Sequence, residues 1–286
     1  MQFSVNTYSF SQLLAAGTTQ VELIHKAKEI GFDSIEFVGI LPHDNSSKTD
    51  YAKLLKKTCD DIGLSISNYT FGSDFINGSN GDTELEVQKV KEEIDIAAVL
   101  GASSVRHDVT QGSKTHFKSF YSNLSLLADV CRKITLYAKQ KGISTMVENH
   151  GTYVQDSDRV EALLNEVDDE NFGLLLDIGN FLCVDEPPEK AVGKLAKYAR
   201  YVHAKDFLFK SGNDTYPGDS FFSTRGGNYL RGTVLGHGTV PVKQCLSILK
   251  NSGFDGTIAI EFEGTEPSAL ALELGLSNLK RYVSEI

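Results

Sequence analysis

Four side chains that could bind a metal ion or move a proton each stand at the end of a short apolar run. Glu148 closes the run in MVENHG, Asp177 that in LLLDIGN, His203 that in YVHAKD and Glu261 that in IAIEFEG. Three carboxylates and one imidazole that met at one point would repel one another as anions unless a cation lay between them. Oxygen ligands with one nitrogen suit Mn²⁺, Mg²⁺, Co²⁺ or Zn²⁺. The expected cofactor is therefore one divalent metal ion.

Each of these residues also has an ordinary structural explanation. A carboxylate at a strand end is often a helix N-cap or a salt-bridge partner, and a lone histidine is often a hydrogen-bonded residue of the core. Residues of the metal-ligand type close four successive runs, which favours a common site. Such a site requires that the fold bring the ends of these four runs together.

Eight β-rich runs alternate with amphipathic helical stretches along the whole chain. The expected strands are 3–7, 34–38, 65–69, 103–108, 144–148, 172–177, 201–206 and 257–261. Right-handed crossovers make such strands parallel, and eight units close into a barrel with the four side chains at its carboxyl-terminal end. A doubly wound open sheet is disfavoured because no glycine-rich phosphate turn follows the first strand. The prediction is one α/β domain, residues 1–286, folded as a (β/α)8 TIM barrel.

One connection is much longer than the others. The 33 residues 207–239 separate the seventh predicted strand from the next helix, and they are rich in turn formers and contain Arg225 and Arg231. A structureless loop of that length is usually functional or mobile. We therefore expect this segment to cover the site.

Composition narrows the class of protein. The chain has 286 residues, a net charge of -10 and scattered basic residues, which disfavours nucleic acid as a partner. Four cysteines far apart in the sequence indicate neither a disulfide framework nor a cysteine zinc site, so a reducing cytoplasm is expected. The first ten residues alternate like a strand rather than a signal peptide, and no apolar run approaches the ~18 residues of a membrane span.

Four more polar residues near predicted strand ends are candidates for substrate binding. Glu36 could be a substrate-side acid or a structural ion-pair partner. His107 could bind a substrate hydroxyl or pack in the core, and His150 could orient substrate or lie in a solvated loop. Lys205 shares the face of His203 because strand side chains alternate, and an internal ion pair is its alternative.

The motifs VENHG, LDIGN, VHAKD and AIEFEG, in this order, resemble the xylose isomerase-like TIM barrel superfamily. It contains sugar isomerases and epimerases of the tagatose epimerase type, inosose and dehydroshikimate dehydratases, and endonuclease IV. The resemblance covers essentially the whole chain. It implies that Glu148, Asp177, His203 and Glu261 are the metal ligands and that the two glutamates are also the catalytic acid and base. It also implies a sugar contact for Arg231, with a surface arginine as the alternative, and a possible homo-oligomer.

The chain departs from this superfamily in places. Asn180 stands three residues after Asp177, where many relatives have histidine. His237 lies between Gly236 and Gly238, where an acidic residue is frequent. The later aspartate and histidine ligands of the three-zinc endonuclease IV have no match here, which disfavours DNA repair.

The expected chemistry is proton transfer at a carbon next to a carbonyl. A metal ion that holds the carbonyl oxygen and a neighbouring hydroxyl would stabilise the enediolate formed on deprotonation. Glu148 and Glu261 would approach from opposite edges, one removing the proton and the other returning it. Return to the opposite face gives epimerisation, return to the adjacent carbon gives isomerisation, and loss of a β-hydroxyl gives dehydration.

Three functions are compatible with these residues. The leading hypothesis is a metal-dependent sugar or polyol isomerase/epimerase that acts on a small carbohydrate, unphosphorylated because no glycine-rich phosphate cradle follows the seventh or eighth strand. The second is a dehydratase of the inosose or dehydroshikimate type. The third is a non-catalytic barrel that binds metal and sugar, against which two positioned glutamates argue.

Overall fold

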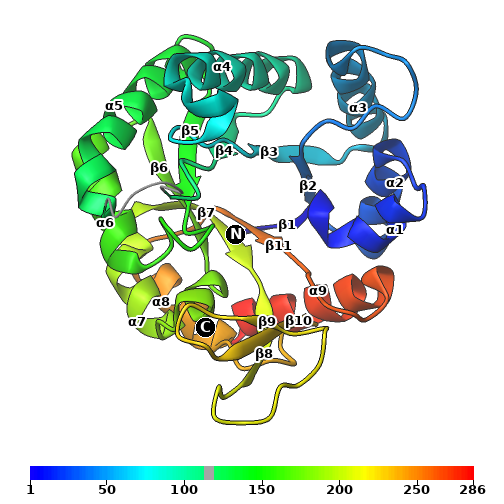
Figure 1. Cartoon of the computed structure of the whole chain (residues 1–286). Coiled ribbons are helices and arrows are strands. Elements are labelled where there is room, and N and C mark those ends of the chain that lie inside the picture. The colour runs from blue at the N-terminus through cyan, green and yellow to red at the C-terminus, as the bar shows by residue number, and fades with distance from the viewer. Residues whose placement is uncertain (113–118) are drawn as a thin grey trace.

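A closed parallel barrel organises the molecule. The computed structural model describes residues 1–112 and 119–286 (Figure 1). Within these residues, eight parallel strands close in the order β1-β11-β7-β6-β5-β4-β3-β2. The strands are β1 (Gln2–Asn6), β2 (Ser34–Val38), β3 (Ser65–Phe71), β4 (Ser104–His107), β5 (Ser144–Glu148), β6 (Phe172–Asp177), β7 (Ala199–Ala204) and β11 (Thr257–Ile260). The predicted barrel is confirmed, and each predicted strand matches to within two residues at either end.

Helices surround the barrel (Figure 1). They are α1 (Ser11–Ala15), α2 (Gln20–Ile30), α3 (Lys48–Ile62), α4 (Thr83–Leu100), α5 (Phe120–Lys139), α6 (Ser157–Val167), α7 (Pro188–Leu195), α8 (Val242–Asn251) and α9 (Ser268–Ser284). Short 3-10 helices span Thr7–Phe10, Gly78–Gly81, Asn180–Val184 and Ala196–Tyr198. Among the described residues, no helix is both long and apolar enough to cross a membrane.

Helix ends follow local sequence signals. At the start of α2, Thr19 Oγ1 accepts the Glu22 backbone N–H at 3.3 Å, and the Glu22 carboxylate accepts the Thr19 N–H at 2.7 Å. The reciprocal pair satisfies two backbone donors that the first helical turn leaves free. The helix stops at Gly31, whose φ of 98° is a left-handed conformation that suits glycine.

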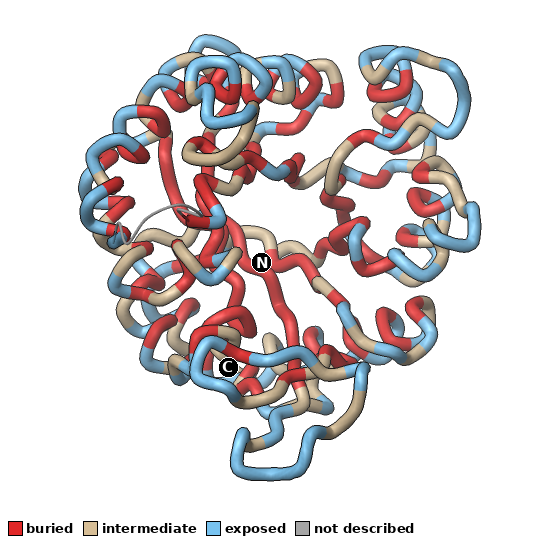
Figure 2. Tube along the Cα trace, in the orientation of Figure 1, coloured by how far each residue is buried: buried red, intermediate tan, exposed pale blue. Residues whose placement is uncertain are grey.

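The barrel interior is layered. The barrel strands are largely buried (Figure 2). Strand side chains alternate, and on the last four barrel strands an apolar layer comes first. It is a buried cluster of Met146, Leu175, Tyr201 and Ala259. The next inward position of each run carries one of the predicted metal ligands: Glu148, Asp177 and His203 on their strands, and Glu261 directly after β11. The four ligands therefore stand in one layer above an apolar floor.

The long segment after β7 is not a structureless loop, and that part of the sequence interpretation was wrong. It forms a three-stranded antiparallel sheet of β8 (Asp206–Lys210), β10 (Tyr229–Thr233) and β9 (Phe222–Ser223), in the order β8-β10-β9. Figure 1 shows this sheet at the rim of the barrel. The buried Asp206 carboxylate closes its base by accepting the backbone N–H groups of Gly236, Gly238 and Val240 at 2.9, 2.8 and 3.0 Å.

Candidate active site

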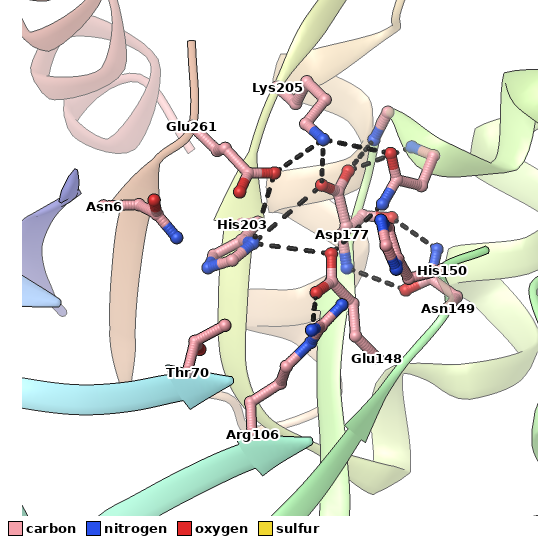
Figure 3. A network of polar contacts seen from close by, with 12 residues as sticks. Asn6, Thr70, Arg106, Glu148, Asn149, His150, Asp177, His203, Lys205 and Glu261 are labelled. Atoms are coloured by element: carbon pink, nitrogen blue, oxygen red, sulfur yellow. Dashed lines mark hydrogen bonds and ion pairs between the residues drawn. The ribbon is translucent and has the colours of Figure 1, made fainter. Parts of the chain in front are cut away.

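The four predicted ligands lie together at the carboxyl-terminal end of the barrel (Figure 3). His203 Nδ1 is 3.5 Å from Glu148 Oε1, 3.6 Å from Glu261 Oε2 and 4.0 Å from Asp177 Oδ2. One ligand atom from each residue lies within 4.8 Å of the others. The residues come from β5, β6, β7 and the end of β11, which are consecutive in the barrel, so the topology brings them to one point.

Asp177 is held so that one oxygen stays available. Its Oδ1 accepts the backbone N–H groups of Gly179 at 2.7 Å and Asn180 at 2.9 Å. Asn149 bridges β5 to β6 by accepting the Asp177 N–H at 2.9 Å and donating to its carbonyl at 2.8 Å. Oδ2 is left facing the cluster, and burial raises the pKa of this carboxyl to about 6.

Two buried atoms of the cluster have no hydrogen-bond partner among the described residues, namely His203 Nδ1 and Asp177 Oδ2, although the Lys205 ammonium lies 3.3 Å from Asp177 Oδ2 as an ion-pair partner. Buried polar atoms are normally paired, and both atoms are of the kind that bind divalent ions. They face the same point as the Glu148 and Glu261 carboxylates. The residues present therefore fit a divalent metal ion, held by one nitrogen and carboxylate oxygens.

Glu36 lies behind His203, which corresponds to the second of its two expected roles, a structural ion-pair partner, and not to a substrate-side acid. Its Oε2 is 2.7 Å from His203 Nε2, and both side chains are buried. Its Oε1 accepts the Thr70 hydroxyl at 2.5 Å and the Asn68 amide at 3.0 Å. With Nε2 held by Glu36, Nδ1 of the ring is directed at the cluster, where a metal ion would take the place of its proton.

Arg106 is a site residue that sequence analysis missed. Its Nε lies 2.6 Å from Glu148 Oε2, and its Nη2 lies 3.0 Å from Asp108 Oδ1. Burial raises the pKa of Glu148, but the charges of Arg106 and His203 outweigh it and hold that pKa well below its usual range. The alternation of side chains along β4 could have revealed Arg106, because Arg106 is paired in strand register with Met146, whose side chain points into the barrel.

His107, the next residue, points the other way into the core. It is fully buried, and its ring lies 6.4, 5.9 and 6.3 Å from the rings of Phe71, Phe75 and Phe172. Its Nδ1 lies 2.8 Å from the Asp108 carbonyl oxygen, and burial lowers its pKa to about 4. The structure therefore does not bring His107 to the pocket where a substrate hydroxyl was expected.

Lys205 lies among the carboxylates. Its ammonium is 2.5 Å from Glu261 Oε2, 3.0 Å from Glu263 Oε1 and 3.3 Å from Asp177 Oδ2, and it donates to Asn180 Oδ1 at 3.1 Å. This position agrees with the sequence analysis, which placed Lys205 on the same face as His203 because side chains alternate along a strand. The ammonium supplies a buried positive charge within the cluster.

A pocket of about 280 Å³ opens over the cluster. It is lined by Tyr8, Val38, Thr70, Phe71, Gly72, Arg106, Asp108, Glu148, His150, Glu261 and Glu263. His150, for which substrate binding and a solvated loop were both left open, lines this pocket, with Nδ1 2.9 Å from Asp108 Oδ1. Burial lowers the pKa of His150, but the hydrogen bond to Asp108 more than offsets this, so the net shift is upward.

The rim sheet does not contribute to this pocket. Among the described residues that line it, none comes from 207–239, so the expected cover over the site is not seen. Arg231 lies on β10, 5.5 Å from the centre of the Phe221 ring, and is outside the pocket lining. The structure therefore does not bring Arg231 to the site, because β10 pairs with β8 at the rim rather than crossing the barrel mouth.

A closed parallel barrel with a carboxylate–histidine cluster at its carboxyl-terminal mouth defines a recognised class. The chain belongs to the xylose isomerase-like TIM barrel family, whose family model matches residues 24–282.

An inosose dehydratase of Clostridium beijerinckii is 26% identical over 267 residues, which cover 89% of this chain and 85% of that protein. Two solved structures share the fold. A D-allulose 3-epimerase from Methylomonas sp. superposes with a TM-score of 0.73 at 18% identity, covering 99% of this chain and 98% of that one. A probable 3-DHS dehydratase from Bacillus anthracis superposes with a TM-score of 0.74 at 18% identity, covering 98% and 99%. The relatives named here are enzymes of two classes.

Proposed function

We propose that this protein is a divalent-metal-dependent enzyme that removes a proton next to the carbonyl of a small polyhydroxy ketone, and that the reaction ends in the loss of water. The observation that carries the proposal is one wall of the pocket, where Glu148, Arg106, Asp108 and His150 form a continuous chain of contacts. The inosose dehydratase relative supports the same reaction class.

Both predicted proton carriers are paired with buried cations. Glu148 contacts Arg106 at 2.6 Å, and Glu261 contacts Lys205 at 2.5 Å. Such pairing favours the carboxylate form. Epimerisation by two carboxyl groups needs one of them protonated to return a proton to carbon, whereas elimination needs one carboxylate base and a separate acid. The pairing therefore favours elimination.

His150 is the candidate acid. It lines the pocket, and Asp108 holds its Nδ1, which leaves Nε2 to face a bound molecule. Glu261 would take the proton from the carbon next to the carbonyl. The electron pair then forms a carbon–carbon double bond as the β-hydroxyl leaves, and that hydroxyl takes a proton from His150 to become water.

The metal ion, held by the four ligands, would polarise the carbonyl oxygen and stabilise negative charge on it. Other residues of the chain hold the reacting groups in position. Arg106 fixes Glu148, Glu36 fixes the ring of His203, and Asp108 fixes His150.

Epimerisation or isomerisation is the second candidate, and one observation favours it. Glu148 and Glu261 stand at nearly equal distances, 3.5 and 3.6 Å, from His203 Nδ1, and they come from strands on either side of it. Two carboxylates on two sides of a bound ketone are the arrangement that proton exchange between faces requires.

The test is to load the protein with Mn²⁺ and incubate it with an inosose, and separately with a ketohexose, in D₂O. Mass spectrometry of the inosose product should show the loss of one water molecule. Deuterium at the carbon next to the carbonyl without loss of water would instead establish the second candidate. Bound metal with no change in either compound would point to the non-catalytic barrel.

Two variants assign the roles. Glu261→Gln and His150→Asn should each lower kcat by about 10²-fold or more, because each removes a group that transfers a proton. His25→Gln is the matched control, since His25 is an exposed histidine on α2. Full turnover by Glu261→Gln with its metal content intact would contradict the mechanism.

A further inference from the structure

Strand β1 brings one polar side chain to the cluster that the proposed mechanism does not use. Asn6, the last residue of β1, is 0% exposed. It is paired in register with Glu36 of β2, and the preceding Val5 is paired with Ile260, which stands just before Glu261. Asn6 therefore lies between the strand that carries Glu36 and the strand that leads to Glu261.

The orientation of the Asn6 amide is determined by its neighbour. The backbone N–H of Tyr8 donates to Asn6 Oδ1 at 2.7 Å. Because an N–H needs an acceptor, the oxygen must face Tyr8, and the NH₂ group must face the other way. Figure 3 shows the amide nitrogen directed toward His203 and Glu261.

This NH₂ group has no acceptor. Among the described residues, Asn6 Nδ2 is one of the buried atoms with no hydrogen-bond partner. Leaving a buried donor unpaired is unfavourable, and an asparagine whose oxygen caps a backbone N–H does not need its nitrogen for that purpose. The donor is satisfied if an acceptor arrives with a bound molecule at the barrel mouth.

We infer that Asn6 is a specificity-determining residue that donates a hydrogen bond to an oxygen of the substrate; the inference rests on the proposed function. The carboxylates of Glu36 and Glu261 stand on the strands at either side of Asn6, which disfavours an anionic group at this position. The acceptor is therefore a neutral oxygen, a carbonyl or a hydroxyl of the polyhydroxy ketone. Its place is on the side of the cluster opposite the Arg106–Glu148 pair (Figure 3).

Two variants distinguish the proposed donor role of the Asn6 NH₂ group from the capping role of Asn6 Oδ1. Asn6→Ser keeps an oxygen near the Tyr8 N–H and removes the distant NH₂ group, and Asn6→Asp keeps the shape and the capping oxygen but has no N–H to donate. In the Mn²⁺-loaded protein, kcat/KM for an inosose should fall about 10- to 100-fold in both variants, as expected for the loss of one such hydrogen bond. Metal content and melting temperature should stay unchanged in Asn6→Ser, whereas Asn6→Asp, which buries a carboxyl group beside Glu36 and Glu261, should keep its metal but melt at a lower temperature. Asn123→Ser, at a largely buried asparagine of α5, is the control and should keep kcat/KM.

A second measurement does not depend on turnover. In the Mg²⁺-loaded protein, the side-chain NH₂ signals of Asn6 are identified in an NMR spectrum by their loss in Asn6→Ser. Addition of an inosose should shift these signals as the hydrogen bond forms.

The inference is overturned if inosose shifts other pocket signals but not those of Asn6, if both variants keep kcat/KM within twofold, or if they lose bound metal. If inosose is neither converted nor bound by the wild-type protein, the proposed function has failed, and the role of Asn6 falls with it.

Discussion

The two nitrogens of the His203 ring have different partners. Nε2 lies 2.7 Å from the Glu36 carboxylate, and Nδ1 faces the cluster with no hydrogen-bond partner among the described residues. Of the two neutral forms of the ring, a carboxylate that accepts Nε2–H selects the one in which Nδ1 carries the lone pair that a metal ion needs. Glu36 can therefore control metal binding from a position at which it makes no contact with the pocket.

This assignment predicts that Glu36→Gln weakens metal binding. The glutamine amide can donate to Nε2, which would put the ring proton on Nδ1, where the metal ion should bind. The dissociation constant for Mn²⁺, measured by calorimetry, should rise about 10- to 100-fold. Glu86→Gln is the matched control because Glu86 is also largely buried but contacts Ser79 and the Asp74 backbone instead. Equal affinity in the two variants would contradict the assignment.

Arg106 and His107 are consecutive residues with opposite environments. Arg106 contacts Glu148 and Asp108, whereas His107 packs among phenylalanine rings. The low pKa of His107, about 4, means that the folded protein binds its proton less readily than the unfolded chain, where the pKa is near 6.5. As the pH falls from about 6.5 to 4, the unfolded state gains the proton first, and stability is lost.

His107→Phe should remove this part of the pH dependence. In the wild type, His107 should lower the free energy of unfolding by about 3 kcal/mol between pH 6.5 and 4, on top of the contribution of other groups. Urea unfolding across this range, with chelator present in both samples, gives the difference between the two proteins. A variant that loses stability as steeply as the wild type would show that His107 is not held neutral.

At the scale of elements, the sequence predicts the barrel because the eight apolar runs are also the eight buried strands. It places Glu148, Asp177 and His203 correctly because alternation and strand-end position are visible in a single run. It does not show Glu36 meeting His203, since that contact joins β2 to β7 across the barrel. It named His107 as a candidate and did not consider Arg106, although the alternation of side chains along β4 decides which of the two points into the barrel.

The rim sheet was beyond prediction for a related reason. The run 201–206 reads as one strand, but β7 ends at Ala204 and β8 begins at Asp206. The buried Asp206 carboxylate accepts N–H groups from residues 30 to 34 positions away, at the returning end of the segment. Such a long-range contact leaves no periodic signal in the sequence.

A substitution at Gly238 tests the close contact between Asp206 and the returning end of this segment. A Cβ there would lie 2.1 Å from Asp206 Oδ1 and 2.4 Å from the Phe207 carbonyl oxygen. Gly238→Ala should therefore lower the free energy of unfolding by about 1–3 kcal/mol through steric strain. Gly193→Ala is the control, since Gly193 is exposed in α7 with nothing within 4 Å of its added Cβ, and it should gain about 0.5–1 kcal/mol. Equal changes in the free energy of unfolding for the two variants, measured by urea unfolding, would contradict the close packing of Gly238 against Asp206.

At the scale of the whole molecule, the chain carries a net charge of -10 and gathers buried carboxylates at one end of its barrel. A divalent ion that binds the folded state and not the unfolded chain stabilises the fold, by about 2.7 kcal/mol when its free concentration is 100 times the dissociation constant. Treatment with a chelator should therefore lower the melting temperature, and Mn²⁺ should restore it. An unchanged melting temperature in both conditions would mean that the cluster binds no ion.

The central claim is that Glu148, Asp177, His203 and Glu261 hold one divalent ion. The most direct measurement is the metal content of protein that has been stripped with chelator, reloaded with Mn²⁺ and desalted, for the wild type and for Asp177→Asn. The asparagine keeps the size of the side chain and removes the charge that faces the ion. The account predicts one ion per chain in the wild type and a large loss in the folded variant. No ion in the wild type, or one ion in both proteins, would contradict it.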